Sequence, residues 1–166
     1  VMQEILSMYS DTIPVFVDPV SQAYAETIVD FIGKFHTAKP NILETEILSG
    51  MKINNKKDLY KAAEKILDKG LKRIFISLGS DGCLYMDREG MHVEKKLKPI
   101  DKMINATGAG DAFMAAVIYS YINDFSLDDT LDYALAAGIA AISHENTINP
   151  NMSVSLIENI LKERKI

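Results

Sequence analysis

Short, largely apolar runs of residues occur at intervals along the 166-residue chain and predict buried β-strands. Such runs cover residues 15–17 and 73–78, and the second of them, Arg-Ile-Phe-Ile-Ser-Leu, is the clearest. A further short strand is expected around residues 37–39, where Pro40 ends it. Residues 84–86 and 91–94 flank Asp-Arg-Glu-Gly, which is typical turn composition, and therefore predict an antiparallel hairpin.

Between these runs, apolar residues recur with the spacing of an amphipathic helix. Gly50 and Gly70 follow two of these segments, where they would end a helix. From residue 112 onward the chain is almost entirely helical in pattern. The expected helices cover residues 2–9, 24–35, 42–48, 57–67, 112–122, 127–143 and 154–162.

Helices that alternate with short buried strands are typical of an α/β fold, in which a largely parallel sheet carries helices on both faces. We see no linker, internal repeat or low-complexity segment, so we expect one domain over residues 1–166. In such folds, ligands bind beyond the carboxyl ends of the strands.

Composition narrows the possible functions. The formal net charge is −5 and no block of Lys and Arg stands out, which argues against a nucleic-acid partner. No run approaches the ~18 apolar residues needed to cross a membrane. The single cysteine, Cys83, excludes an internal disulfide and a multi-cysteine metal site, and it suits a reducing cytoplasm.

The most specific motif is Thr107 to Phe113, with the sequence Thr-Gly-Ala-Gly-Asp-Ala-Phe. A Gly-Ala-Gly turn that opens a helix leaves backbone N–H groups directed at one point, where a phosphate would bind. We expect Asp111 at the first helical position, where its carboxylate could accept a proton from a hydroxyl that attacks a γ-phosphoryl group. Alternatively, Asp111 caps the helix and the glycines form a tight turn.

Two weaker patterns lie upstream. Asn41 and Glu44 stand three residues apart after a predicted strand, where they could meet a hydrated Mg²⁺ or form a helix capping box. The loop from Ser77 to Gly82 could approach a nucleotide or serve as an ordinary strand-to-hairpin turn. Asp18, after the first strand, could orient a metal or phosphate or cap a helix.

The Thr107 to Phe113 motif and the small-residue helix after it resemble the second signature of ribokinase-like carbohydrate kinases of the PfkB type. The resemblance implies a three-layer, Rossmann-like ribokinase fold. It implies that Asp111 is the catalytic base and that the amides of Gly108, Ala109 and Gly110 form the anion hole. It assigns Mg²⁺ to Asn41 and Glu44, and it assigns ATP contacts to Asn41, Ser77, Gly79, Ser80, Gly82, Thr107, Gly138 and Asn149.

Finer matches at residues 14–21, 36–37, 39–41, 48–50 and, above all, 145–150 resemble the pseudouridine kinase subgroup. The resemblance implies transfer of the ATP γ-phosphoryl group to the 5′-hydroxyl of pseudouridine. Kinases of ribose, fructose or adenosine, or a non-catalytic nucleotide-binding module, are the alternatives. Many family members have Asp where this chain has Asn105, a position tied to a monovalent cation, so potassium dependence stays open.

Such kinases have roughly twice this length, and their N-terminal half supplies most sugar contacts and a lid that forms dimers. We therefore expect this chain to be the C-terminal, ATP-binding part of such an enzyme. By itself it should be inactive, and the full-length protein would be a homodimer.

Overall fold

The computed structural model describes residues 1–98, 100, 104–105 and 107–165. They form two compact units: unit 1 comprises Val1–Leu78 and Leu84–Glu94, and unit 2 comprises Gly79–Cys83 and Lys95–Ile166. The expectation of one domain stays a prediction, because two compact units can belong to one domain or to two.

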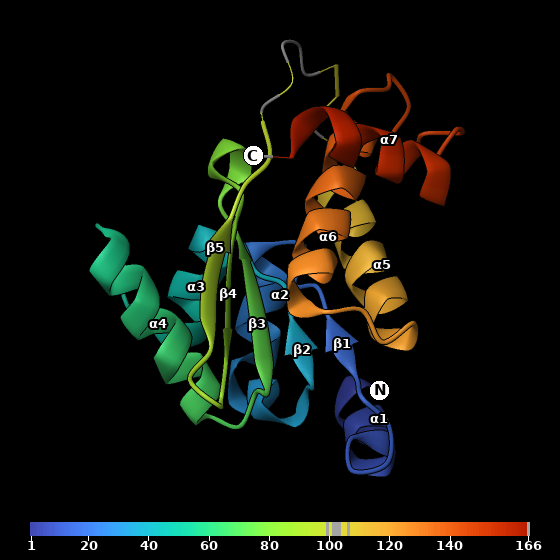
Figure 1. Cartoon of the computed structure of the whole chain (residues 1–166). Helices are drawn as coiled ribbons and strands as arrows, with labels where there is room; N and C mark the ends of the chain where they lie inside the picture. The colour runs from blue at the N-terminus through green and yellow to red at the C-terminus, as the bar shows by residue number, and fades with distance from the viewer. Residues whose placement is uncertain (99, 101–103, 106, 166) are drawn as a thin grey trace. The chain divides into compact units, whose positions relative to one another are not determined.

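The sheet has the strand order β1-β2-β3-β4-β5, which is also the order along the chain (Figure 1). β1 pairs with β2 and β2 with β3 in parallel, as the sequence predicted. The predicted hairpin is also present, and its turn is closed by a 3.1 Å hydrogen bond from the Asp87 N–H to the Met91 carbonyl. The strands are β1 (Phe16–Val17), β2 (Thr37–Ala38), β3 (Arg73–Ser77), β4 (Cys83–Asp87) and β5 (His92–Lys95).

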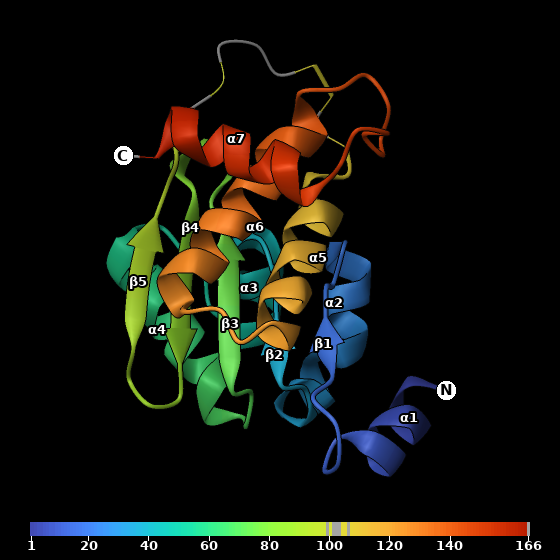
Figure 2. The same cartoon turned by 45° about the vertical axis from the view of Figure 1, so that its right-hand side comes forward.

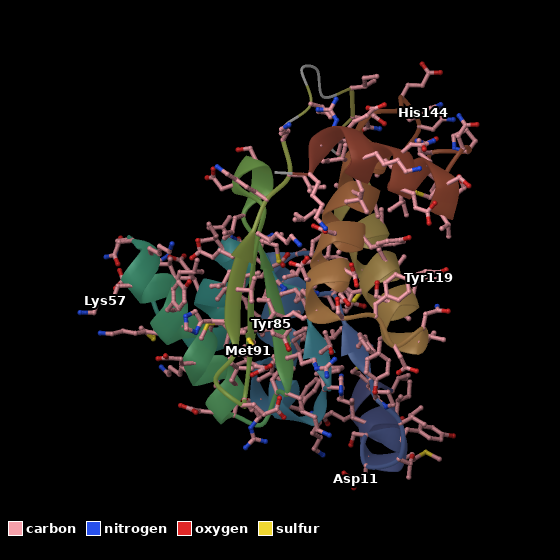
Figure 3. All side chains as sticks on the ribbon, in the orientation of Figure 1. Asp11, Lys57, Tyr85, Met91, Tyr119 and His144 are labelled. Atoms are coloured by element: carbon pink, nitrogen blue, oxygen red, sulfur yellow. The ribbon has the colours of Figure 1, made fainter. Side chains whose placement is uncertain are left out.

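The crossover helices of unit 1 gather on one face of the sheet, as Figures 1 and 2 show. Parallel strands that follow one another across a sheet through right-handed connections place their helices on the same side. In α4, Lys57 points away from the sheet (Figure 3), whereas the apolar positions of the helix are buried. These connections are α2 (Gln22–Ile28), η1 (Val29–Lys34), α3 (Ile42–Ser49) and α4 (Lys56–Asp68), whereas α1 (Met2–Tyr9) precedes β1.

Alternation along the central strands divides their side chains between two faces. Ile74 and Ile76 of β3 belong to the core beneath the helices, together with Leu84 of β4. Phe75 and Tyr85 are also buried but lie outside this core, with ring centroids 4.9 Å apart. Because both faces of these strands are buried, their sequences read as continuous apolar runs.

The prediction of a single helix over residues 24–35 is wrong in its extent. α2 ends at Ile28, and the chain continues as the 3₁₀ segment η1, in which Phe31 leaves helical geometry with φ −129°. Three consecutive β-branched residues, Thr27 to Val29, lose side-chain freedom in an α-helix and weaken it at this point.

Unit 2 is built on an antiparallel helix pair, α5 (Ala109–Ile122) and α6 (Leu127–Ile142), which pack side by side (Figures 1 and 2). α7 (Val154–Arg164) packs on α6, and the short 3₁₀ segment η2 (Gly79–Asp81) completes the elements described in this unit. Ser126 and Ser153 cap α6 and α7 by accepting hydrogen bonds from backbone N–H groups. Within the described part of the chain, no helix has both the length and the apolar character that a membrane span requires.

Candidate active site

The entrance of α5 in unit 2 carries the most specific sequence motif. Gly108 is the N-cap residue and has a left-handed backbone with φ +85°, so the helix begins at Ala109. Asp111 is therefore the third helical residue and not the first, as the sequence had suggested. The difference arises because glycine turns the chain without steric cost, which lets helical geometry begin before the continuous small-residue run.

The first turn of α5 offers backbone N–H groups that have no partner within the helix. Its first intrahelical bond runs from the Ala112 N–H to the Gly108 carbonyl, at 3.0 Å. Among the residues that the structure describes, no side chain caps this helix end, and Asp111 is exposed. The alternative in which Asp111 caps the helix is thus not what the structure shows. A positive helix end and an exposed carboxylate stand in the same turn.

Gly108 is fixed by its surroundings as well as by its backbone angle. A Cβ atom at this position would lie 2.3 Å from the Thr147 carbonyl oxygen, far inside contact distance. At Gly138 of α6 a Cβ would meet the Ala109 carbonyl at an ordinary 3.7 Å. The loop after α6 and the C-terminal part of that helix therefore both approach the start of α5.

Asn149 lies in the same loop and is buried, with 5% of its surface exposed. Its Nδ2 donates to the Ala140 carbonyl at 2.8 Å, and its Oδ1 accepts from the Asn151 N–H at 2.9 Å. The polar atoms of this side chain thus order the loop. Its predicted contact with ATP stays a prediction.

The glycines of the predicted nucleotide loop differ from one another. Gly79 and Ser80 of η2 are exposed, and the space beside Gly79 is open. Gly82 is buried with φ +91°, and a Cβ there would lie 2.1 Å from the Lys95 carbonyl oxygen. Packing alone accounts for Gly82, whereas Gly79 and Ser80 leave room for a ligand.

In unit 1, Asn41 and Glu44 form a capping box at the start of α3. Asn41 Oδ1 accepts from the Glu44 N–H, and Glu44 Oε2 accepts from the Asn41 N–H, both at 2.9 Å. The Ser77 N–H donates to the Pro40 carbonyl at 3.0 Å, and Ser77 pairs with Asn41 in a parallel bridge. Three of the predicted residues therefore meet at the carboxyl ends of β2 and β3.

This capping box leaves Glu44 Oε1 outside the pair of bonds, and Glu44 is only 3% exposed. No group of three or more His, Cys, Asp or Glu residues that could hold a metal occurs within the described ranges. A hydrated Mg²⁺ does not require one, since it keeps several waters and uses one or two carboxylates. The oxygen donors of this pair therefore fit magnesium chemistry.

Sequence reasoning missed a buried ion pair in unit 1. Lys39 Nζ lies 3.0 Å from Asp18 Oδ2, and the side chains are 6% and 14% exposed. Asp18 does not cap α2, because Ser21 is the N-cap residue and accepts from the Tyr24 N–H. Both charged residues directly follow parallel strands, which is the signal that could have predicted their proximity.

Comparison with known proteins then decides the family. The sequence profile of the pfkB family carbohydrate kinases matches residues 2–153. The chain belongs to this family. The pseudouridine kinase of Escherichia coli (strain K12) is 38% identical over 152 residues, which cover 89% of this chain and 48% of that protein. The 1-phosphofructokinase of the same strain is 33% identical over 108 residues, 65% of this chain and 34% of that protein.

Solved structures of the family agree in fold. A protein from Clostridium perfringens assigned as a sugar kinase superposes with a TM-score of 0.94 at 36% identity, over 99% of this chain and 51% of that one. Arabidopsis thaliana ribokinase, complexed with ribose and ATP, superposes with a TM-score of 0.82 at 21% identity, over 96% of this chain and 51% of that one. The predicted ribokinase-like fold is confirmed, and the chain spans about half the length of these proteins.

Proposed function

We propose that the full-length protein is an ATP-dependent phosphotransferase that acts on a primary hydroxyl of a sugar or nucleoside. Its acceptor in this proposal is pseudouridine and its product is pseudouridine 5′-phosphate. The observation that carries the proposal is the exposed carboxylate of Asp111 in the uncapped first turn of α5, next to the left-handed Gly108. The identity of 38% to a pseudouridine kinase supports the choice of acceptor.

In the proposed reaction, the Asp111 carboxylate accepts the proton of the acceptor hydroxyl. The hydroxyl oxygen forms a bond to the γ-phosphorus, the bond from that phosphorus to the β–γ bridging oxygen breaks, and ADP leaves. Amides of Gly108, Ala109 and Gly110 stabilise the charge on the three equatorial oxygens of the transferring group. The carboxylate and the amides act within one helical turn, so a single rigid element sets their geometry.

Magnesium and ATP belong to the same proposal. Asn41 and Glu44 would hold the waters of Mg²⁺, which neutralises the β- and γ-phosphates when it is bound. Ser77, Gly79, Ser80 and the other nucleotide contacts expected from the sequence would hold ATP. A cytoplasmic location and a homodimer of the full-length protein complete the proposal.

A coupled assay of ADP release by the full-length protein tests the proposal, with pseudouridine, uridine, ribose, fructose and adenosine as acceptors. Uridine is the matched control, because it carries the same ribose and differs in the bond to the base. We expect the highest kcat/KM for pseudouridine. A free sugar or adenosine as the best acceptor would overturn the choice of acceptor. ATP binding without ADP release for any acceptor would instead support the non-catalytic module.

A further inference from the structure

The segment just before α5 is hydrogen-bonded to the end of α6. The N–H groups of Ile104 and Asn105 both donate to the Ile142 carbonyl, at 2.9 and 3.3 Å. Ile142 is the last residue of α6, so its carbonyl has no partner within the helix. These bonds join the segment that leads to the turn at Gly108 to the last residue of α6.

The side chain of Asn105 extends this connection in two directions. Its Nδ2 donates to the Glu145 carbonyl at 3.0 Å, and its Oδ1 accepts from the Thr107 N–H at 2.9 Å. One bond therefore needs a donor and the other needs an acceptor, on the same planar group. Among side chains of this size, only an amide supplies both.

A second contact joins the same two segments. The Thr147 carbonyl lies over Gly108, where a Cβ would come within 2.3 Å of its oxygen. Asn105 thus holds the loop at Glu145 while Gly108 packs against the same loop two residues later. Both contacts therefore constrain the backbone just before the N–H groups of the first turn of α5.

We propose that Asn105 is a positioning residue for phosphoryl transfer, acting through the Glu145 carbonyl and the Thr107 N–H to fix the turn at Gly108. This inference rests on the proposed kinase function. The turn contacts the transferring group, whose charge develops in the transition state, while other residues hold the rest of ATP. Loss of Asn105 should consequently lower kcat and leave the KM for ATP almost unchanged.

Asn105→Asp in the full-length protein tests this role, because it keeps the acceptor for Thr107 and replaces the donor to Glu145 by an oxygen. The assay uses buffer free of alkali cations, so that no ion bridges the two facing oxygens. We expect kcat to fall by about 10- to 100-fold, the effect of a misplaced catalytic group. The KM for ATP should stay within about 3-fold, since ground-state binding is retained. Asn151→Asp, at an exposed position later in the same loop, is the matched control and should retain the kcat of the unmodified protein.

Hydrogen exchange of the peptide that covers residues 107–112 provides a readout independent of turnover. Exchange should accelerate in Asn105→Asp and not in Asn151→Asp. Unchanged kcat and exchange in Asn105→Asp would overturn the inference, as would a loss of activity that only parallels a fall in thermal stability. If the unmodified protein releases no ADP, the proposed function fails, while the exchange experiment still decides whether Asn105 fixes the turn.

Discussion

The two units differ in whether the polar groups of the candidate site are paired with other groups of the protein. At the carboxyl edge of the sheet in unit 1, Lys39 is paired with Asp18, and Asn41 is paired with Glu44. At the entrance of α5 in unit 2, the helix end is uncapped and Asp111 is exposed. Groups that are paired within the protein contribute to stability, whereas groups left without a protein partner are available to a ligand. Substitution of Asp111 should therefore impair turnover first, and substitutions that disturb the packing of unit 1 should impair stability first.

The largest effect is expected for Asp111→Asn in the full-length protein. The amide retains the size of the side chain but cannot accept the hydroxyl proton, so kcat should fall by about 10²- to 10⁴-fold, the usual contribution of a general base. The Kd for ATP should change little, since the substitution leaves the backbone amides in place. Steady-state kinetics and calorimetric ATP titration measure the two quantities.

Asp124→Asn is the control for this experiment. Asp124 follows the other end of α5 and has φ +53°, a conformation that Asn also tolerates. Near-normal turnover of Asp111→Asn would show that Asp111 is not the catalytic base. It would also contradict the functional difference proposed between the two units.

In unit 1, Gly33→Ala should reduce stability. A Cβ at Gly33 would lie 1.9 Å from the Lys69 carbonyl oxygen, a backbone atom that cannot rotate away. We expect a loss of about 1–3 kcal/mol in the free energy of unfolding, as for other overpacked sites. Urea unfolding of the full-length protein measures it.

Gly138→Ala in unit 2 is the matched glycine control for stability. Its Cβ would meet the Ala109 carbonyl at 3.7 Å, and alanine favours a helix by up to about 1 kcal/mol over glycine. We expect neutral or increased stability. Equal destabilisation by both substitutions would show that the close approach at Gly33 is not the cause.

The smallest effect concerns His36 in unit 1. Burial, with further contributions from Arg73 and Lys72, lowers the pKa of His36 to about 4. The unfolded chain takes up this proton near pH 6.5, so it binds more protons than the folded chain between about pH 6.5 and 4. The free energy of unfolding should therefore decrease as the pH falls through this window and be insensitive to His36 below it.

Because the His36 ring is only partly buried, we expect a contribution on the order of 1–2 kcal/mol, reduced by solvent screening. Urea unfolding at several pH values is compared for the unmodified protein and for His36→Gln. The contribution of His36 is the difference between the two proteins in how steeply the free energy of unfolding changes with pH. The same substitution at the exposed His92 controls for the loss of a histidine as such. Identical slopes for the unmodified protein and His36→Gln would contradict the prediction.

Much of the fold could be predicted from local sequence. The run at residues 73–78 and the turn at Asp87 to Gly90 predicted β3 and the hairpin, because strand composition and turn chemistry act over a few residues. The helix over 24–35 failed at Ile28, where the helical periodicity continued but the β-branched run did not sustain α-helical geometry. The candidate residues of the site came from motifs, and the capping box of Asn41 and Glu44 was one of the two interpretations of its motif. Pairings between residues distant in sequence were not predicted: the bond from Asn105 to Glu145 spans 40 positions.

The sequence by itself determined most of the strands and helices and the glycine turn that opens α5, because each depends mainly on neighbouring residues. Only the tertiary structure decided which polar groups distant in sequence are paired. Asp18 met Lys39 because parallel strands end at one edge, and Thr147 came to lie over Gly108 because α6 returns alongside α5. Contacts between residues distant in sequence depend on how whole elements pack, which no local pattern records.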